Sequence, residues 1–300
     1  MLLLEGPPQP IYALAFSPDG QRLVAGAKAG EPWFWNESGS REILNCNFDA
    51  GVNSAAYSPT GESLAVAGLK GLVIVHCTTL CDGQTVYVRS DAVNPSVAAV
   101  RYLGEHLLAV GSGHRAKSSP GRFELWDLRE DRRREPAFTA PYGVRAVAVQ
   151  PERGLLAWSE WGAATTSGPR LTIWDIRKPD PLRIGLTHPA AALAFHPDGE
   201  TLAATCEWGV RLFDVQLKRE RFTIKGHTGV VTSAEFSPDG RSLATGSWDG
   251  TVRFWDPING AERGCFRCPI GKVTAMAFSP DGLRLAAGGD KGAVVVWDLD

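Results

Sequence analysis

His, Ser and Asp, the three side chains of a serine-hydrolase triad, fall in one part of the sequence as His227, Ser247 and Asp249. In such a triad the histidine takes the serine proton while the carboxylate orients the imidazole. The reaction also needs hydrogen-bond donors for an oxyanion, and no sequence element here supplies them. Trp255 follows closely, and an indole beside these groups favours a packed polar network. We therefore expect no catalytic residue here and no enzyme.

Tryptophan recurs in three short turn-like segments: "SEWG" at 159–162, "CEWG" at 206–209 and "SWDG" at 247–250. Turn tips are usually wet and polar, so an indole there needs a reason. Since Trp is enriched in interface hot spots, we predict a partner-binding patch. The alternative is that each indole only shields its own turn. The candidate partner-binding residues are Trp161, Trp208, Trp248, Glu160, Tyr142 and Arg145.

An acid adjoins each of these tryptophans, and Glu160 and Asp249 are the two we expect at the surface. An aromatic and acidic patch attracts Lys and Arg side chains through cation–π contacts. We therefore expect the partner to be a protein or peptide with exposed Lys or Arg. Nucleic acid is not expected, because the patch would repel phosphates and the chain has 31 basic against 33 acidic residues.

"CFRC" at 265–268 has the C-x-x-C spacing of some metal sites. It falls on a predicted strand, where residues three apart point to opposite faces, so we expect no metal and no cofactor. No apolar stretch is long enough to span a bilayer, and no membrane partner is expected. Without a secretory signal, the scattered cysteines indicate free thiols and a cytoplasmic protein. The other cysteines are Cys46, Cys77, Cys81 and Cys206.

The elements that must position these residues belong to a sequence repeat. "FSPDGRSLATG" from Phe236 has close copies elsewhere, with weaker copies filling the gaps. Seven anchors 41 to 47 residues apart account for the whole chain of 300 residues: Phe16, Tyr57, Tyr102, Val149, Phe195, Phe236 and Phe278. A period of this length is typical of propellers and solenoids.

Each copy contains four runs of strand length separated by Gly, Pro and Asp. In the sixth copy "VVTSAEF" leads into S-P-D-G, which suits a type I turn, and three further apolar runs follow. No segment has helical period and helical length. The pattern predicts an all-β protein: one seven-bladed β-propeller of four-stranded antiparallel blades over residues 1–300.

The copies resemble the WD-repeat β-propeller family, since "WD" closes four of them, at residues 126, 174, 255 and 297. In that family the face that carries the second turns is a frequent partner site, and the residue before the turn Asp, here Trp248, is a frequent contact. The resemblance also implies a structural polar network of His227, Asp249 and Trp255, completed by Thr245 or Ser247. The fold itself hosts many unrelated functions.

The N-terminal segment aligns without a gap so that residues 2–4 fall opposite 222–224, an outer fourth strand. The last copy ends after its third strand, at 293–297. We therefore expect residues 2–4 to pair there, which closes the ring and hides two sheet edges. On this basis the chain is expected to form a complete propeller.

The sequence favours a non-enzymatic interaction scaffold that uses the face with the tryptophan turns. Two alternatives remain: a propeller enzyme, either a hydrolase or a lyase, and a small-ligand sensor that acts at the mouth of the central channel. Both need carboxylates, histidines or a metal that converge on the channel, and the sequence aligns none.

Overall fold

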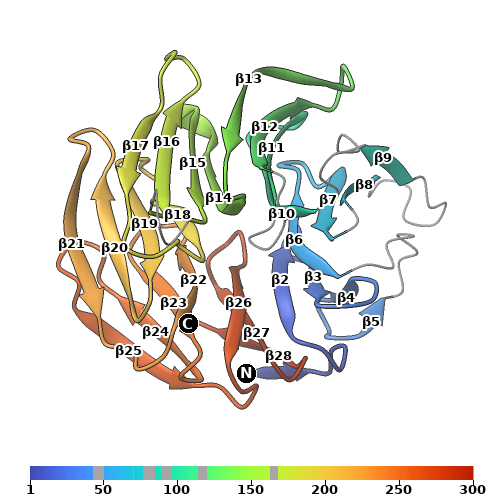
Figure 1. Cartoon of the computed structure of the whole chain (residues 1–300). Coiled ribbons are helices and arrows are strands. Elements are labelled where there is room, and N and C mark those ends of the chain that lie inside the picture. The colour runs from blue at the N-terminus through green and yellow to red at the C-terminus, as the bar shows by residue number, and fades with distance from the viewer. Residues whose placement is uncertain are drawn as a thin grey trace.

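Seven antiparallel four-stranded sheets stand around a central channel as the blades of a β-propeller (Figure 1). This computed structural model describes residues 1–42, 51–69, 71–76, 85–88, 96–113, 120–162 and 168–299. The all-β, seven-bladed fold predicted from the repeats is confirmed.

The two inner strands of each blade carry most of the buried apolar side chains. The innermost strands line the channel, and they are β2 (Ile11–Phe16), β6 (Val52–Tyr57), β10 (Val97–Tyr102), β14 (Val144–Gln150), β18 (Leu193–Phe195), β22 (Val231–Phe236) and β26 (Val273–Phe278). The second strands are β3 (Arg22–Ala27), β7 (Ser63–Gly68), β11 (Leu107–Ser112), β15 (Leu155–Glu160), β19 (Thr201–Cys206), β23 (Leu243–Ser247) and β27 (Arg284–Gly289).

The two outer strands complete each blade. The third strands are β4 (Trp33–Asn36), β8 (Gly71–His76), β12 (Gly121–Asp127), β16 (Arg170–Asp175), β20 (Gly209–Asp214), β24 (Thr251–Trp255) and β28 (Val294–Asp298). The outermost strands are β5 (Arg41–Glu42), β9 (Thr85–Val88), β13 (Arg132–Ala140), β17 (Leu182–Gly185), β21 (Arg219–Lys225), β25 (Glu262–Arg267) and β1 (Leu2–Leu4). A short 3₁₀ helix, η2 (Pro151–Arg153), follows β14.

The ring is closed by the two ends of the described chain. Strand β1 pairs antiparallel with β28, with Leu3 opposite Val295, so blade seven takes its outermost strand from the N-terminal segment. The N-terminus lies beside β28 in Figure 1. The predicted closure is confirmed, and it leaves neither the outer edge of β28 nor strand β1 unpaired.

Blades pack through a glycine on the second strand that receives a branched side chain from the next blade. A Cβ on Gly246 would come within 2.5 Å of Val273 Cγ1, and a Cβ on Gly26 within 2.2 Å of Val52 Cγ1. The A-T-G and V-A-G segments of the repeat therefore end in glycine because the neighbouring blade fills the space of the missing side chain. This contact sets how closely the blades approach the channel.

The S-P-D-G turns are held by their own side chains. Ser237 Oγ donates to Asp239 at 2.6 Å and accepts from the backbone N–H of Ser242 at 3.0 Å. Gly240 has φ +72°, a left-handed conformation that favours glycine. This turn joins the first and second strands, so it lies at the opposite end of the blade from the tryptophan turns.

Candidate functional site

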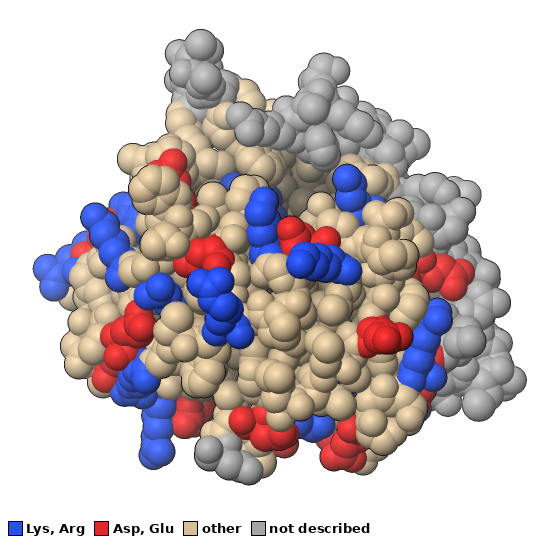
Figure 2. Space-filling view, turned by 90° about the horizontal axis from the view of Figure 1, so that it is seen from below, with Lys and Arg blue, Asp and Glu red and all other residues tan. Residues whose placement is uncertain are grey.

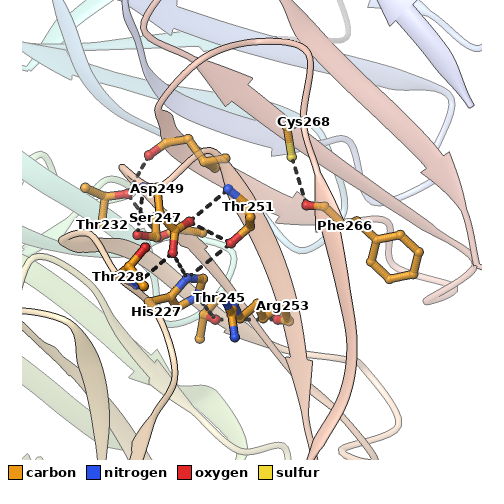
Figure 3. Close-up of polar contacts among 12 residues, drawn as sticks. His227, Thr228, Thr232, Thr245, Ser247, Asp249, Thr251, Arg253, Phe266 and Cys268 are labelled. Carbon is orange, nitrogen blue, oxygen red and sulfur yellow. Dashed lines mark hydrogen bonds and ion pairs between the residues drawn. The ribbon is translucent and has the colours of Figure 1, made fainter.

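Blade six holds a buried polar network that links its inner strands to the turn after β23 (Figure 3). His227 Nδ1 lies 2.8 Å from Asp249 Oδ2, and His227 Nε2 lies 2.7 Å from Thr245 Oγ1. Trp255 Nε1 donates to the same Thr245 oxygen at 2.8 Å. The structure thus brings together His227, Thr245, Asp249 and Trp255 from three separate segments of the sequence.

The chemistry of the donors assigns a direction to this chain of hydrogen bonds. The indole N–H of Trp255 can only donate, so Thr245 Oγ1 accepts it and gives its own proton to Nε2 of His227. The imidazole then carries its proton on Nδ1 and donates it to the carboxylate of Asp249. A neutral His227 satisfies every group in the chain.

Burial and hydrogen bonding set the charges of this network. Burial lowers the pKa of His227, and this outweighs the opposing effect of the neighbouring Asp249. Burial acts to raise the pKa of Asp249, but hydrogen bonds from Thr251, His227 and the Thr228 N–H outweigh it and bring the pKa to about 2. The folded state therefore holds a neutral imidazole beside an ionised carboxylate.

The sequence reasoning left Thr245 and Ser247 as alternatives and did not include Thr251. Ser247 Oγ accepts from the Asp249 N–H at 3.1 Å and makes no bond to the imidazole. Thr251 donates through Oγ1 to Asp249 at 2.6 Å and through its N–H at 2.9 Å. The D-G-T order, which puts a hydroxyl two residues after a turn Asp, is the signal that could have identified it.

The hydroxyl, imidazole and carboxylate spacing of this network matches that of a hydrolase, but its surroundings do not. Thr245 is fully buried, and its oxygen is already bonded to the Trp255 indole. A substrate carbonyl has no path to that hydroxyl, so nucleophilic attack cannot occur at this position.

Trp248 is an exposed side chain in the turn between β23 and β24, with 48% of its surface accessible. The Lys272 ammonium lies 4.9 Å from the centroid of its ring, in the segment just before β26. The indole therefore already has a cation over it from the approach to blade seven.

Trp161 has a similar companion in blade four. It is half-buried after β15, and the guanidinium carbon of Arg145 lies 4.4 Å from the centroid of its ring. Arg145 also donates to the Pro189 carbonyl at 2.8 Å, which ties β14 to the segment before β18. Tyr142 is half-buried in the loop before β14, and residues 163–167, which continue the Trp161 turn, lie outside the described residues.

Trp208 is the most exposed of the three tryptophans, at 62%. Cys206 pairs with Gly209, so its turn contains only Glu207 and Trp208 and is one residue shorter than the turn of blade six. Counted from the strand leucine, Trp208 stands where blade six has Asp249, and Glu207 stands where it has Trp248. Glu207 is exposed, unlike Asp249 of blade six, and pairs with His188 at 2.9 Å.

The prediction that Glu160 and Asp249 lie at the surface, as the acids of an aromatic and acidic patch, is wrong. Glu160 is 5% exposed, and its carboxylate accepts from the Trp158 indole N–H at 3.0 Å. Burial raises its pKa, against smaller effects of Trp158 and nearby arginines. The Asp249 carboxylate is occupied by the blade-six network, and its side chain is 8% exposed. Neither acid is available at the surface to a partner's Lys or Arg.

The three turns that carry the tryptophans join the second and third strands of adjacent blades four, five and six. Every blade has the same strand order, so these turns leave the ring on the same side. A backbone contact joins the blade-five turn to blade six: the Val231 N–H at the start of β22 donates to the Glu207 carbonyl at 2.6 Å. We call Trp161, Trp208 and Trp248, together with Arg145 and Lys272, the tryptophan face.

Acidic and basic side chains are interspersed on the surface seen in Figure 2.

No helix in the described part of the chain has the length and apolar character that a bilayer span requires. Within the described ranges, no three His, Cys, Asp or Glu side chains cluster as metal ligands would. Cys265 is exposed and Cys268 is buried, while Cys46, Cys77 and Cys81 lie outside the described residues.

Comparison with known proteins finds relatives for several parts of the chain. The family model described as "WD domain, G-beta repeat" matches residues 2–36, 218–256 and 262–298. A serine-threonine kinase receptor-associated protein of Dictyostelium discoideum is 32% identical over 133 residues, which is 44% of this chain and 42% of the relative.

Two further relatives are matched over most of this chain. A guanine nucleotide-binding protein subunit beta of Oryza sativa subsp. japonica is 25% identical over 264 residues, 86% of this chain and 58% of the relative. Periodic tryptophan protein 2 of Arabidopsis thaliana is 25% identical over 84% of this chain and 27% of its own length. The chain thus spans about half the length of the Dictyostelium and Oryza relatives, 42% and 58% respectively.

Proposed function

Because this chain belongs to the WD-repeat family of β-propellers, we propose that it is a non-enzymatic scaffold that binds a protein or peptide through its tryptophan face. Two relatives are named for proteins that they accompany, one as a subunit and one as receptor-associated. Such names support a role in assembly for this chain as well.

The exposure of two tryptophans on adjacent blades carries the proposal. Trp208 and Trp248 leave 62% and 48% of their surfaces accessible, although a Trp side chain is among the most favourable to bury. Interface hot spots are enriched in Trp and Arg, and both residue types occur on this face. A partner that covers these indoles would gain the apolar burial that the free propeller leaves unused.

The charges of the tryptophan face favour a partner with acidic side chains. Arg145 and Lys272 lie over two of the indoles, and the acids that the sequence placed at the surface are buried or engaged. A cation–π contact of about 0.5–1 kcal/mol leaves the positive charge in place. We therefore propose that a partner presents an apolar side chain to Trp208 or Trp248 and a carboxylate to Lys272, in place of the Lys or Arg expected from the sequence.

The enzyme alternative has less support. The arrangement closest to a catalytic triad is buried and fully hydrogen-bonded in blade six. The same contacts support a structural role for that network, since it ties the loop before β22 to the turn after β23.

Capture of partners by the tagged protein tests the proposal. The double variant Trp208→Ala/Trp248→Ala should lose the proteins that the unaltered chain retains, with its Tm within a few degrees because both side chains are exposed. Lys272→Glu should weaken capture of an acidic partner and leave Trp248 in place. Phe266→Ala is the matched control, since Phe266 is 49% exposed on the outermost strand β25.

The proposal is overturned if the double variant and Phe266→Ala retain the same proteins with equal yield. If the double variant loses its partners because it unfolds, the single variant Trp248→Gln, whose side chain is larger than alanine, replaces it. Normal capture by Trp248→Gln also overturns the proposal. The charge assignment is wrong if Lys272→Glu strengthens capture.

A further inference from the structure

One register position of the innermost strands differs sharply between blades. It is the residue that precedes the aromatic or apolar anchor, and the seven residues there are Ala15, Ala56, Arg101, Ala148, Ala194, Glu235 and Ala277. Five blades use alanine, whereas blade three has an arginine and blade six a glutamate. Blades three and six are as far apart as two blades of this ring can be, so these side chains come from opposite sides of the channel.

Both charged side chains line the central cavity of the propeller. The cavity has a volume of about 390 Å³ and is lined by residues from all seven innermost strands. Alanine is the commonest residue of the lining, which leaves the space open. Small-molecule sites typically have about 300–1,000 Å³ and a few fixed polar groups on an otherwise apolar wall.

Arg101 is fixed by one end of its guanidinium. Its Nη1 donates to Ser54 Oγ of blade two at 3.1 Å and to the Val100 carbonyl at 2.8 Å. Among the residues that the structure describes, none accepts a hydrogen bond from its Nε or Nη2. These two N–H groups form one edge of the guanidinium, the edge that matches the two oxygens of a carboxylate.

Glu235 is held in the same manner. Its Oε2 accepts from the Phe278 N–H of blade seven at 2.9 Å, and no described residue donates to Oε1. No ion pair joins Glu235 to Arg101 within the described structure, although each charge acts on the pKa of the other. The cavity therefore presents an unused carboxylate-binding edge on one side and an unused carboxylate oxygen on the other.

We propose that the central channel binds a small zwitterion, a molecule with a carboxylate for Arg101 and an ammonium group for Glu235, such as a free amino acid. Small side chains of the cavity wall, among them Ala148 and Ala194, accommodate its aliphatic part. This site does not depend on the tryptophan face, although Arg145 lines the cavity and also lies over Trp161.

The protonation of Glu235 controls the ammonium side of the site. Burial raises its pKa to about 7, against smaller effects of the Phe278 N–H and Arg101. The charged groups that face it are Arg101 from β10 and Arg145 from β14; strands β18 and β26, packed on either side, add none to the cavity lining. Binding of an ammonium group requires the ionised carboxylate and should weaken as the pH falls below 7.

Calorimetric titration of the whole chain tests the proposal with glycine, β-alanine, 4-aminobutyrate and 5-aminopentanoate, a series that varies the spacing of the two charges. Propionate and propylamine are the controls with one charge each. At least one zwitterion should bind about tenfold or more tightly than both controls. Arg101→Ala and Glu235→Ala should each lose that preference, since they restore the residue of the other five blades.

Glu235→Gln keeps the shape of the site and removes only its charge. It should abolish the preference for the zwitterion, keep any affinity for propionate and remove the pH dependence near 7. The proposal is overturned if no member of the series binds at up to about 10 mM, or if binding is unchanged in Glu235→Gln. An Arg101→Ala/Glu235→Ala protein that binds as well as the unaltered chain also overturns it.

Discussion

Blades four and six bury a carboxylate at the same end of the second strand but in opposite electrostatic settings. In blade six, Asp249 accepts from His227, Thr228 and Thr251, and its pKa falls to about 2. In blade four, Glu160 has the indole of Trp158 at 3.0 Å and the hydroxyl of Thr172 at 3.5 Å, and burial raises its pKa. At Asp249 the hydrogen-bond donors together outweigh burial, whereas at Glu160 burial outweighs the donors.

The tryptophans of the two blades also differ in whether they hydrogen-bond to a network or pack on another ring. In blade six the Trp255 indole enters the polar network through Thr245. In blade four a tryptophan, Trp158, takes the position of Thr245 itself and stacks on Phe123 at a centroid distance of 4.2 Å. Blade four thus replaces a hydrogen-bonded chain with aromatic packing, and its carboxylate is left with few partners.

The largest effect is expected from Asp249→Asn. The amide keeps one acceptor oxygen but turns an NH₂ group toward groups that also donate, so at least one buried donor loses its partner. The free energy of unfolding should fall by about 2–3 kcal/mol at pH 7. Urea unfolding measures the change, and a loss no larger than that of Glu160→Gln would remove the contrast between the two blades.

Thr245→Val should have the next largest effect, about 1–2 kcal/mol, since it removes the acceptor of the Trp255 N–H and the donor to His227. The matched variant is Thr172→Val in blade four, whose hydroxyl is equally buried but, among the described residues, makes only the long contact to Glu160. The Tm values of the two variants, measured by thermal unfolding, should differ by several degrees. Equal losses would indicate that the network adds nothing beyond burial of a hydroxyl.

Glu160→Gln should have a smaller effect of the opposite sign. Because the folded pKa of Glu160 lies above the ordinary value of 4.5, its ionisation costs stability as the pH rises through the folded pKa. The neutral amide avoids this cost and should leave the protein equally stable or up to about 1 kcal/mol more stable at pH 8. At pH 4 the difference should vanish; a variant less stable at pH 8 would contradict the assignment.

Blade six should respond to acid in the other direction. The folded pKa of Asp249 lies below 3.8, so its contribution is present above that pH and is lost as the pH falls toward 2. The lowered pKa of His227 acts in the same sense below 6.5, since the unfolded chain binds the proton more readily. Asp249→Asn should therefore reduce the dependence of stability on pH between 4 and 2, measured by urea unfolding across that range.

The smallest effect is expected from Ser247→Ala, below about 1 kcal/mol. Ser247 is buried, but its Oγ makes one neutral hydrogen bond, accepting from the Asp249 N–H at 3.1 Å, and it does not contact the imidazole. A loss as large as that of Thr245→Val, in the same urea experiment, would show that Ser247 belongs to the network after all.

Much of the blade-six site was expected because the repeats resemble the WD-repeat family. That resemblance implied a network of His227, Asp249 and Trp255, and the structure brings these three side chains together. The choice of Thr245 over Ser247 could not be made from the sequence, because the geometry of adjacent strands decides which of the two hydroxyls reaches the imidazole. The sequence analysis also treated the three tryptophan turns as equivalent. The turn of blade five is one residue shorter, which moves Trp208 to the position of the turn Asp.

The number of blades, the turns between strands and the closure of the ring by Leu2–Leu4 could all be predicted from the sequence, since they follow from a period, a turn signal and the strand that the last copy lacks. Three features emerged only in three dimensions: the burial of Glu160, the cations Arg145 and Lys272 over Trp161 and Trp248, and the placement of Arg101 and Glu235 on opposite sides of the channel. Repeat signals are local along the chain, whereas these contacts join different strands, turns or blades. Their geometry depends on how closely the blades pack around the channel, which no single repeat encodes.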